Sequence, residues 1–166
     1  YCRYMQKITP CLWFEKNNAE EAMQFYTSIF KNSKIVSIER YPEGVKEGPL
    51  AGMDGKVLTG IVELEGQRFM CLDGGPVFSF TGAISFQVEC DSQEELDRYW
   101  KALSADPASE QCGWLKDKYG VAWQITPSVV GKLLADPDKK KADKVMQAML
   151  QMKKIVIADL EKAYKG

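Results

Sequence analysis

Apolar and polar residues alternate along two short segments of the chain, residues 7–14 and 83–90. Because successive side chains of a strand point to opposite faces of its sheet, this alternation predicts two strands that each bury one face. Apolar residues at helical spacing follow both segments, and each stretch opens with a pair of glutamates: Glu20 and Glu21 in the first, Glu94 and Glu95 in the second. Each strand is therefore predicted to lead into an amphipathic helix.

The two strand-and-helix segments also match each other along the chain. Residues 9–30 lie over residues 83–104 without a gap, which places Thr9 on Ala83. Chance similarity between two amphipathic helices is the alternative interpretation, but a repeat of this length is typical of a fold built from two copies of one unit. We predict an α+β protein made of tandem β-α-β-β-β units that form a curved mixed sheet.

Shorter apolar runs supply the remaining predicted strands. Three of them complete the first unit: residues 34–41, 57–65 and 67–72. A Gly- and Pro-rich connection, residues 42–56, separates the first two, and connections of that length are often lids or binding loops. In the second unit, residues 110–116 and 121–126 are predicted to form a hairpin through a type I turn at residues 117–120.

These elements predict a single domain with three parts: a first unit at residues 5–76, a second unit at residues 82–127, and a C-terminal helical extension at residues 128–166. Polar residues suited to capping precede both repeated helices. Asn18 is predicted to cap the first helix, and Ser92 with Glu95 has the spacing of a capping box for the second.

Composition narrows the class of protein. At 166 residues and 45% hydrophobic content, the chain is long enough for one well-cored domain. Its formal net charge of -1 creates no field that attracts nucleic acid or a membrane surface, and no stretch approaches the roughly 18 apolar residues of a membrane span. Five cysteines without a C-x-x-C pair are typical of reduced thiols, and no signal-peptide pattern is visible. We therefore expect a cytoplasmic protein without nucleic-acid or membrane partners.

The chain contains no histidine. This excludes a Ser-His-Asp triad, a Cys-His pair and a His-ligated zinc site. Catalysis, if there is any, would depend on amides, hydroxyls and carboxylates.

The faces of the predicted strands separate core residues from candidate site residues. In strand 83–90 the alternate positions Ile84, Phe86 and Val88 suit a helix-covered surface, and the opposite, more polar face requires a cleft. Six residues of such inward faces are predicted to bind a ligand: Thr9, Cys11, Trp13, Ser85, Gln87 and Gln124. Trp13 would form an aromatic wall of the cleft, or alternatively pack beneath the 42–56 connection. The sequence offers no histidine to activate Cys11 as a nucleophile.

Two residues are candidates for a catalytic role, Gln124 and Asp73. Gln124 lies on the polar face of the last strand, although it could instead be an ordinary hydrogen-bonded amide. Asp73 follows a strand directly and could act as a base, but an aspartate before two glycines is also common in turns. The other tryptophans are expected in the core: Trp100, Trp114 and Trp123.

Several segments resemble one known family. The segments ITPCLWF, AEEAMQFY, LDGGP, AISFQVEC, QEELDRYW and, most specifically, QCGWLKDKYGVAWQITP are similar to the PhnB-like, or 3-demethylubiquinone-9 3-methyltransferase-like, branch of the glyoxalase/bleomycin resistance/dioxygenase (vicinal oxygen chelate) superfamily. The resemblance covers nearly everything from Met5 to the C-terminus, and it implies that superfamily's fold, with a curved-sheet cleft, and a homodimer. The methyltransferase part of the label has no support in a glycine-rich nucleotide loop.

The resemblance also indicates where a superfamily metal would bind. The corresponding positions hold Thr9, Ala83, Met70 or Leu72, and Gln124. A hydroxyl, an apolar group and a neutral amide are poor ligands for a divalent cation, so we expect no metal and no cofactor.

Three functions are compatible with these residues. The first is a protein that binds a small organic molecule in a sheet-lined cleft without the usual metal. The second is a superfamily enzyme that acts on a small metabolite. The third is a structural or regulatory dimer, and fold analogy does not choose among them.

Overall fold

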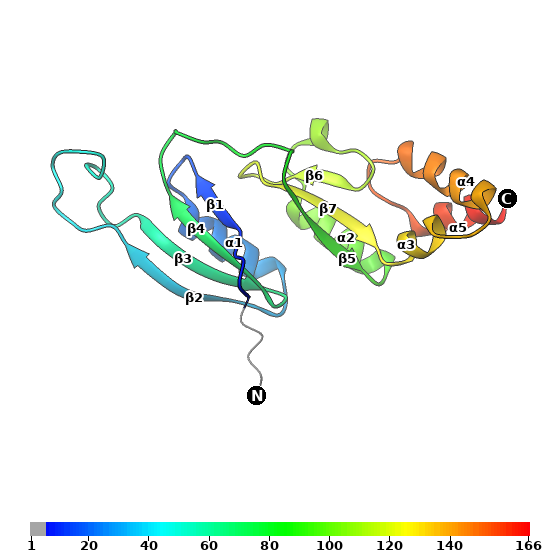
Figure 1. Ribbon diagram of the computed structural model, residues 1–166, viewed down its shortest axis with the longest axis horizontal. Coiled ribbons are helices and arrows are strands. Elements are labelled where there is room, and N and C mark those ends of the chain that lie inside the picture. Colours follow the sequence, from blue (N-terminus) through cyan, green and yellow to red (C-terminus); the bar gives the residue numbers. More distant parts are fainter. Residues whose placement is uncertain (1–5) are drawn as a thin grey trace. The chain divides into compact units, whose positions relative to one another are not determined.

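The computed structural model describes residues 6–166. Residues 1–5, including Cys2 and the predicted domain start at Met5, lie outside the described part. The chain divides into two compact units, one ending at Ser79 and the other running from Phe80 to Gly166 (Figure 1). Each unit is described by itself below.

The first unit has the predicted order of one strand, one helix and three strands. Its elements are β1 (Cys11–Phe14), α1 (Ala19–Ile29), β2 (Ser33–Arg40), β3 (Val57–Leu64) and β4 (Gln67–Asp73). The four strands form one mixed sheet in the order β1-β4-β3-β2, with β1 parallel to β4 and the other pairs antiparallel. This order confirms the β-α-β-β-β arrangement for the first unit.

Alternation along the strands sets which face of this sheet is buried. In β1, Leu12 and Phe14 are buried, whereas Cys11 is exposed and Trp13 half-buried. The buried side chains pack with the apolar stripe of α1, which includes Met23 and Tyr26. The strand is shorter than the predicted residues 7–14 because it begins only after Pro10, which has no N–H to donate to a sheet.

The second unit has the three strands that its residues predicted, which is one fewer than a full β-α-β-β-β unit contains. Its elements are β5 (Ser85–Cys90), α2 (Gln93–Leu103), the 3-10 helix η1 (Pro107–Ser109), β6 (Trp114–Lys116) and β7 (Ala122–Pro127). The sheet order is β5-β7-β6, with β5 parallel to β7 and β6 antiparallel to β7. The α+β class is confirmed, and the two units differ by one strand.

The physical reason for the missing strand lies in the segment after α2. A proline begins η1, and the polar groups of the segment bond to the outer edge of β6. Ala105 N donates to Lys116 O at 3.0 Å, and Lys116 N donates to Ser109 Oγ at 2.9 Å. The loop therefore satisfies the edge of β6 that a further strand would otherwise pair with.

The start of α2 follows the predicted capping box. Glu95 N donates to Ser92 Oγ at 3.1 Å, and Glu95 Oε2 accepts from Asp91 N at 2.9 Å. The carboxylate therefore satisfies the N–H immediately before the cap.

The C-terminal extension is helical and belongs to the second unit. It contains α3 (Val129–Leu134), α4 (Lys139–Leu150) and α5 (Ile157–Lys165), which follow β7 in Figure 1. The link between α4 and α5 is bound to the turn before β6, because Cys112 N and Gly113 N each donate at 2.8 Å, to Met152 O and Lys153 O. Across residues 6–166, no helix combines the length and apolar character needed to cross a membrane.

Candidate functional site

Three of the predicted ligand-binding residues lie together on the second sheet. Gln87 pairs with Gln124 across β5 and β7, and Ser85 pairs with Ala122. Trp123 and Ile125 are buried, so Gln124 between them lies on the opposite face of the sheet from α2. Gln124 Nε2 donates to Ser85 Oγ at 2.9 Å. We call the face that carries Ser85, Gln87 and Gln124 the polar face of the second sheet.

Trp114 also belongs to this polar face, which corrects the expectation that it lies in the core. Its register partner is Gln124, and directly opposed residues of neighbouring strands share a face. Trp114 is 38% exposed, whereas the next residue, Leu115, is 1% exposed. The sequence could have predicted this exposure. The length of the turn at residues 117–120 fixes the register of the hairpin, and the register sets the face on which Trp114 lies. Trp123 is buried as expected.

In the first unit, Trp13 packs against the segment that follows β4. Its Nε1 donates to Gly75 O at 2.9 Å, and its ring meets that of Phe78 edge-on at a centroid distance of 5.0 Å. A Cβ added to Gly74 would lie 2.0 Å from the Trp13 ring, so the indole requires glycine there. These contacts involve residues 74–78, whereas the sequence suggested packing beneath residues 42–56.

The other two predicted residues of the first unit lie beside Trp13 in sequence. Thr9 is half-buried and precedes β1, and Cys11 begins β1 opposite Met70. Cys11 and Trp13 point to the face of the first sheet opposite α1, since Leu12 and Phe14 point toward the helix. Thr9, Cys11 and Trp13 belong to one unit, and Ser85, Gln87 and Gln124 to the other.

Burial raises the pKa of each of the four cysteines in the described part of the chain. Partial burial raises the pKa of Cys11 and of Cys112. Burial raises the pKa of Cys71 to about 12, with smaller contributions from Cys11 and Asp73, and burial likewise raises the pKa of Cys90 to about 12. These four cysteines are free, and Cys11 is exposed rather than buried. A raised pKa gives Cys11 no nucleophilic advantage.

Asp73 joins three elements of the first unit. It is 2% exposed, and its Oδ1 and Oδ2 each accept one main-chain N–H at 2.8 Å, from Ala19 and Val57. Asn18 occupies the N-cap position of α1 but makes no side-chain cap hydrogen bond, so the prediction that it caps the helix is wrong. Asp73 caps α1 instead, from a position distant in sequence, and the same carboxylate ties the helix to the start of β3.

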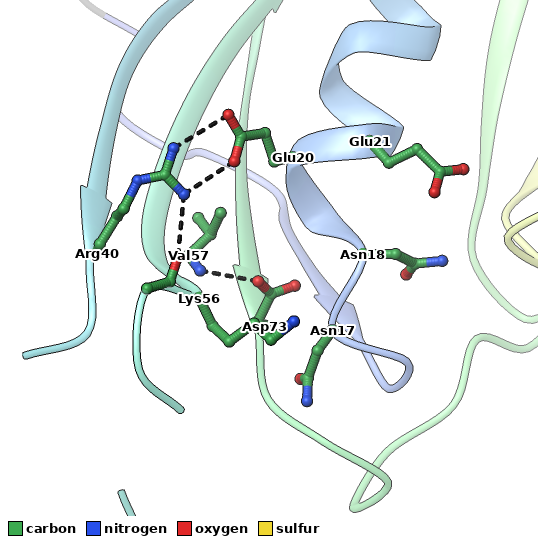
Figure 2. A pocket seen from close by; sticks show the side chains of 9 residues that line it. Asn17, Asn18, Glu20, Glu21, Arg40, Lys56, Val57 and Asp73 are labelled. Carbon is green, nitrogen blue, oxygen red and sulfur yellow. Dashed lines mark hydrogen bonds and ion pairs between the residues drawn. The ribbon is translucent and has the colours of Figure 1, made fainter. Parts of the chain in front are cut away.

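A polar pocket of about 230 Å³ lies beside this carboxylate (Figure 2). Figure 2 shows Arg40 at the end of β2 facing Glu20 in the first turn of α1. The guanidinium donates to both Glu20 oxygens, at 2.8 and 3.0 Å, and to Gly55 O at 3.0 Å. The hydrogen bonds from Arg40 lower the pKa of Glu20. No pattern in the sequence predicted this pocket. The Arg40 guanidinium is already paired with Glu20 through a bidentate ion pair.

The residues present do not fit a divalent metal. Among residues 6–166, no group of three or more His, Cys, Asp or Glu side chains is placed to hold a metal ion. Gln124, at one of the positions that correspond to superfamily ligands, offers a neutral amide already bonded to Ser85.

Comparison with known proteins identifies relatives. The model of a family described as 3-demethylubiquinone-9 3-methyltransferase matches residues 6–126. The solved PhnB protein from Bacillus cereus is 45% identical, with a TM-score of 0.61, and the match covers 74% of this chain and 100% of that one. The structure of PA1353 from Pseudomonas aeruginosa, 20% identical with a TM-score of 0.56, covers 74% and 97% and shows a similar fold. No curated protein matches the chain.

These matches set the C-terminal extension apart. The family model ends at residue 126, and 74% of this chain covers the whole of the Bacillus cereus chain. About a quarter of this chain therefore has no counterpart in that structure.

Proposed function

Because this chain belongs to the 3-demethylubiquinone-9 3-methyltransferase family, of which the PhnB-like proteins are members, we propose that it binds a small organic molecule on the sheet faces opposite its helices. Thr9, Cys11 and Trp13 would serve this function in the first unit. Ser85, Gln87 and Gln124 would serve it in the second, without a metal or a cofactor.

The state of Gln124 is the observation that carries this proposal. Its side chain is half-buried on the polar face, and Ser85 Oγ accepts from its Nε2. In the described part of the chain, no hydrogen bond is made to its Oε1. This acceptor is open on the polar face, so it is able to accept a hydrogen bond from a ligand that carries a donor.

The family description alone does not make this chain a methyltransferase. The nucleotide-binding folds that use a glycine-rich turn are built on doubly wound parallel sheets. Here the sheets have four and three strands, and each contains antiparallel pairs. Fold membership and site chemistry are separate arguments. The polar face carries amides, hydroxyls and an indole, and also the carboxylate of Glu89 and the amine of Lys116.

We also propose that the protein is a homodimer in a reducing compartment such as the cytoplasm. Four free cysteines support the compartment, because oxidising compartments favour disulfides. Apolar side chains exposed on α4 support the dimer, and they are discussed below.

A thermal-shift screen of metabolites and planar antibiotics tests the binding function. A true ligand is expected to raise the melting temperature by about 5–10 °C at about 100 times its Kd, because it stabilises only the folded state. Gln124→Ala and Trp13→Ala should each reduce that shift. Gln24→Ala, which removes an exposed glutamine of α1, is the matched control and should leave the shift unchanged.

Mass spectrometry of the recovered ligand separates binding from catalysis. An unchanged compound after long incubation supports binding. Turnover that is lost in Gln124→Ala or Asp73→Asn would replace the proposal with a superfamily enzyme. A screen in which no compound shifts the melting temperature would leave a structural or regulatory dimer.

A further inference from the structure

We propose that Trp114, Gln124 and Gln87 form a stacking site for a planar nitrogen heterocycle that carries an amino donor beside a ring-nitrogen acceptor. This inference rests on the proposed binding function and adds to it the ligand class and a residue outside the predicted site.

The strand register places the three side chains in one row. Trp114 of β6 is opposite Gln124 of β7, and Gln124 is opposite Gln87 of β5. Neighbouring strands lie roughly 4.8 Å apart, so the row spans about 10 Å across the sheet. That span matches the size of a one- or two-ring heterocycle.

Trp114 provides the aromatic surface. Its indole is 38% exposed, whereas the neighbouring Leu115 and Trp123 are 1% and 3% exposed, so the ring is accessible to a ligand. Every planar base offers a π-face to such a ring, and stacking of this kind contributes substantially to binding of nucleobases.

The backbone on which Trp114 sits is held from several sides. Its N and O both pair with Gln111, across a two-residue turn in which Cys112 and Gly113 have φ values of 51° and 85°. Two positive φ values are typical of a type I′ hairpin turn. The N–H groups of this turn donate to Met152 O and Lys153 O of the C-terminal extension. The extension therefore positions the turn that precedes Trp114, which favours a preformed binding surface.

The two amides provide the hydrogen-bonding edge. Gln124 Oε1 is available to accept, because only its Nε2 is bonded, to Ser85. Gln87 is exposed on the same face and offers both an N–H donor and a carbonyl acceptor. Glutamine pairs well with an amino group next to a ring nitrogen, as in adenine. The row thus combines a stacking surface with the complement of that edge.

Titration with adenine and cytosine, monitored by tryptophan fluorescence and calorimetry on the full chain, tests the inference. Purine and 2(1H)-pyrimidinone, which lack only the amino group, are the matched control compounds for adenine and cytosine. We expect at least one amino compound to bind saturably and more tightly than its control. Trp114→Leu should weaken its binding roughly tenfold or more, and Trp114→Phe should weaken it less, because an aromatic face remains.

Two further variants define specificity. Gln87→Ala should reduce the preference for the amino compound over its control. Trp100→Phe, at a half-buried tryptophan of α2, should leave binding unchanged. Circular dichroism and the melting temperature of each variant establish that the fold is retained.

The outcomes distinguish this inference from the binding function itself. If neither amino compound binds better than its control, or if Trp114→Leu binds as the wild type does, the inference is wrong. A ligand from the thermal-shift screen that depends on Gln124 but not on Trp114 would overturn the inference and leave the binding function standing. If no compound of either experiment binds, both proposals fail.

Discussion

At the residue scale, each unit contains one buried aspartate whose carboxylate joins several segments of the chain. In the first unit Asp73 bonds to the main chain of α1 and β3. In the second, Asp117 accepts from Tyr119 N and Val121 N through Oδ1 and from Trp123 Nε1 through Oδ2. Both side chains are nearly fully buried, and a buried carboxylate is tolerated because main-chain or indole N–H groups surround it.

Asp73→Ala is expected to lower the free energy of unfolding by about 2–4 kcal/mol, because two buried N–H groups lose their acceptor. Asp73→Asn should cost less, since its amide keeps one acceptor oxygen. Urea denaturation followed by circular dichroism measures both. Asp143→Ala, at an exposed position of α4, is the control and should change stability little. A stable Asp73→Ala protein would contradict the structural role described here.

Buried thiols predict a dependence of stability on pH. Burial raises the pKa of Cys71 and Cys90 to about 12, above the ordinary value of 9.0, so the folded protein retains protons that the unfolded chain releases. The contribution of these two thiols to the free energy of unfolding is therefore fully present below about pH 9, and it is lost as the pH rises toward 12. Cys71→Val should make this fall shallower in denaturation experiments at several pH values. An unchanged slope in this variant would show that Cys71 does not contribute.

At the scale of elements, the turn before β6 tolerates substitution least, because it packs closely against the C-terminal extension. Gly113 has a φ of 85°, and a Cβ there would lie 3.1 Å from Ile125 O and 3.4 Å from Ile155 Cγ1. Ile155, in the link before α5, is completely buried. Any side chain at residue 113 would strain the backbone and crowd this link at the same time.

Gly113→Ala is therefore expected to destabilise the protein by about 1–3 kcal/mol. Gly131→Ala is the matched control, because Gly131 lies in α3 with open space at its Cβ position. That substitution should be neutral or stabilise the protein by up to about 1 kcal/mol. Melting temperatures measure both effects, and equal shifts for the two variants would argue against the junction described here.

At the scale of the whole molecule, α4 presents apolar side chains on two sides. Val145 and Met149 are buried in the second unit, whereas Met146 and Leu150 are 40% and 47% exposed. One helix face would suffice for packing within the unit, and exposed apolar residues that adjoin one another often mark contacts between subunits. These residues support the proposed symmetric dimer with an interface that includes α4.

Sedimentation at micromolar concentration is expected to show a dimer. The double variant M146K and L150K should shift it toward monomer, because it places two charges in the apolar contact. Leu58→Lys, at an exposed leucine of β3, is the control and should leave the dimer intact. A wild-type monomer would contradict the dimer, and dissociation by the control alone would move the interface to the first sheet.

The sequence by itself determined the features that depend on residues a few positions apart in the chain. Alternation along β1 and β7 correctly separated Leu12, Phe14, Trp123 and Ile125 from the opposite faces. The capping box of Ser92 and Glu95 is equally local. Such features are encoded by the period of strands and helices and by short-range hydrogen bonds, so they can be interpreted before the fold is known.

Only the tertiary structure decided the features that depend on distant partners. Asp73 replaces Asn18 as the cap of α1 across 54 positions of sequence, and the fold alone brings them together. The exposure of Trp114 depends on its register with β7, and the absence of a fourth strand depends on the loop that bonds to Lys116. These choices are set by competition among long-range contacts, in which a local preference is one small contribution to the free energy.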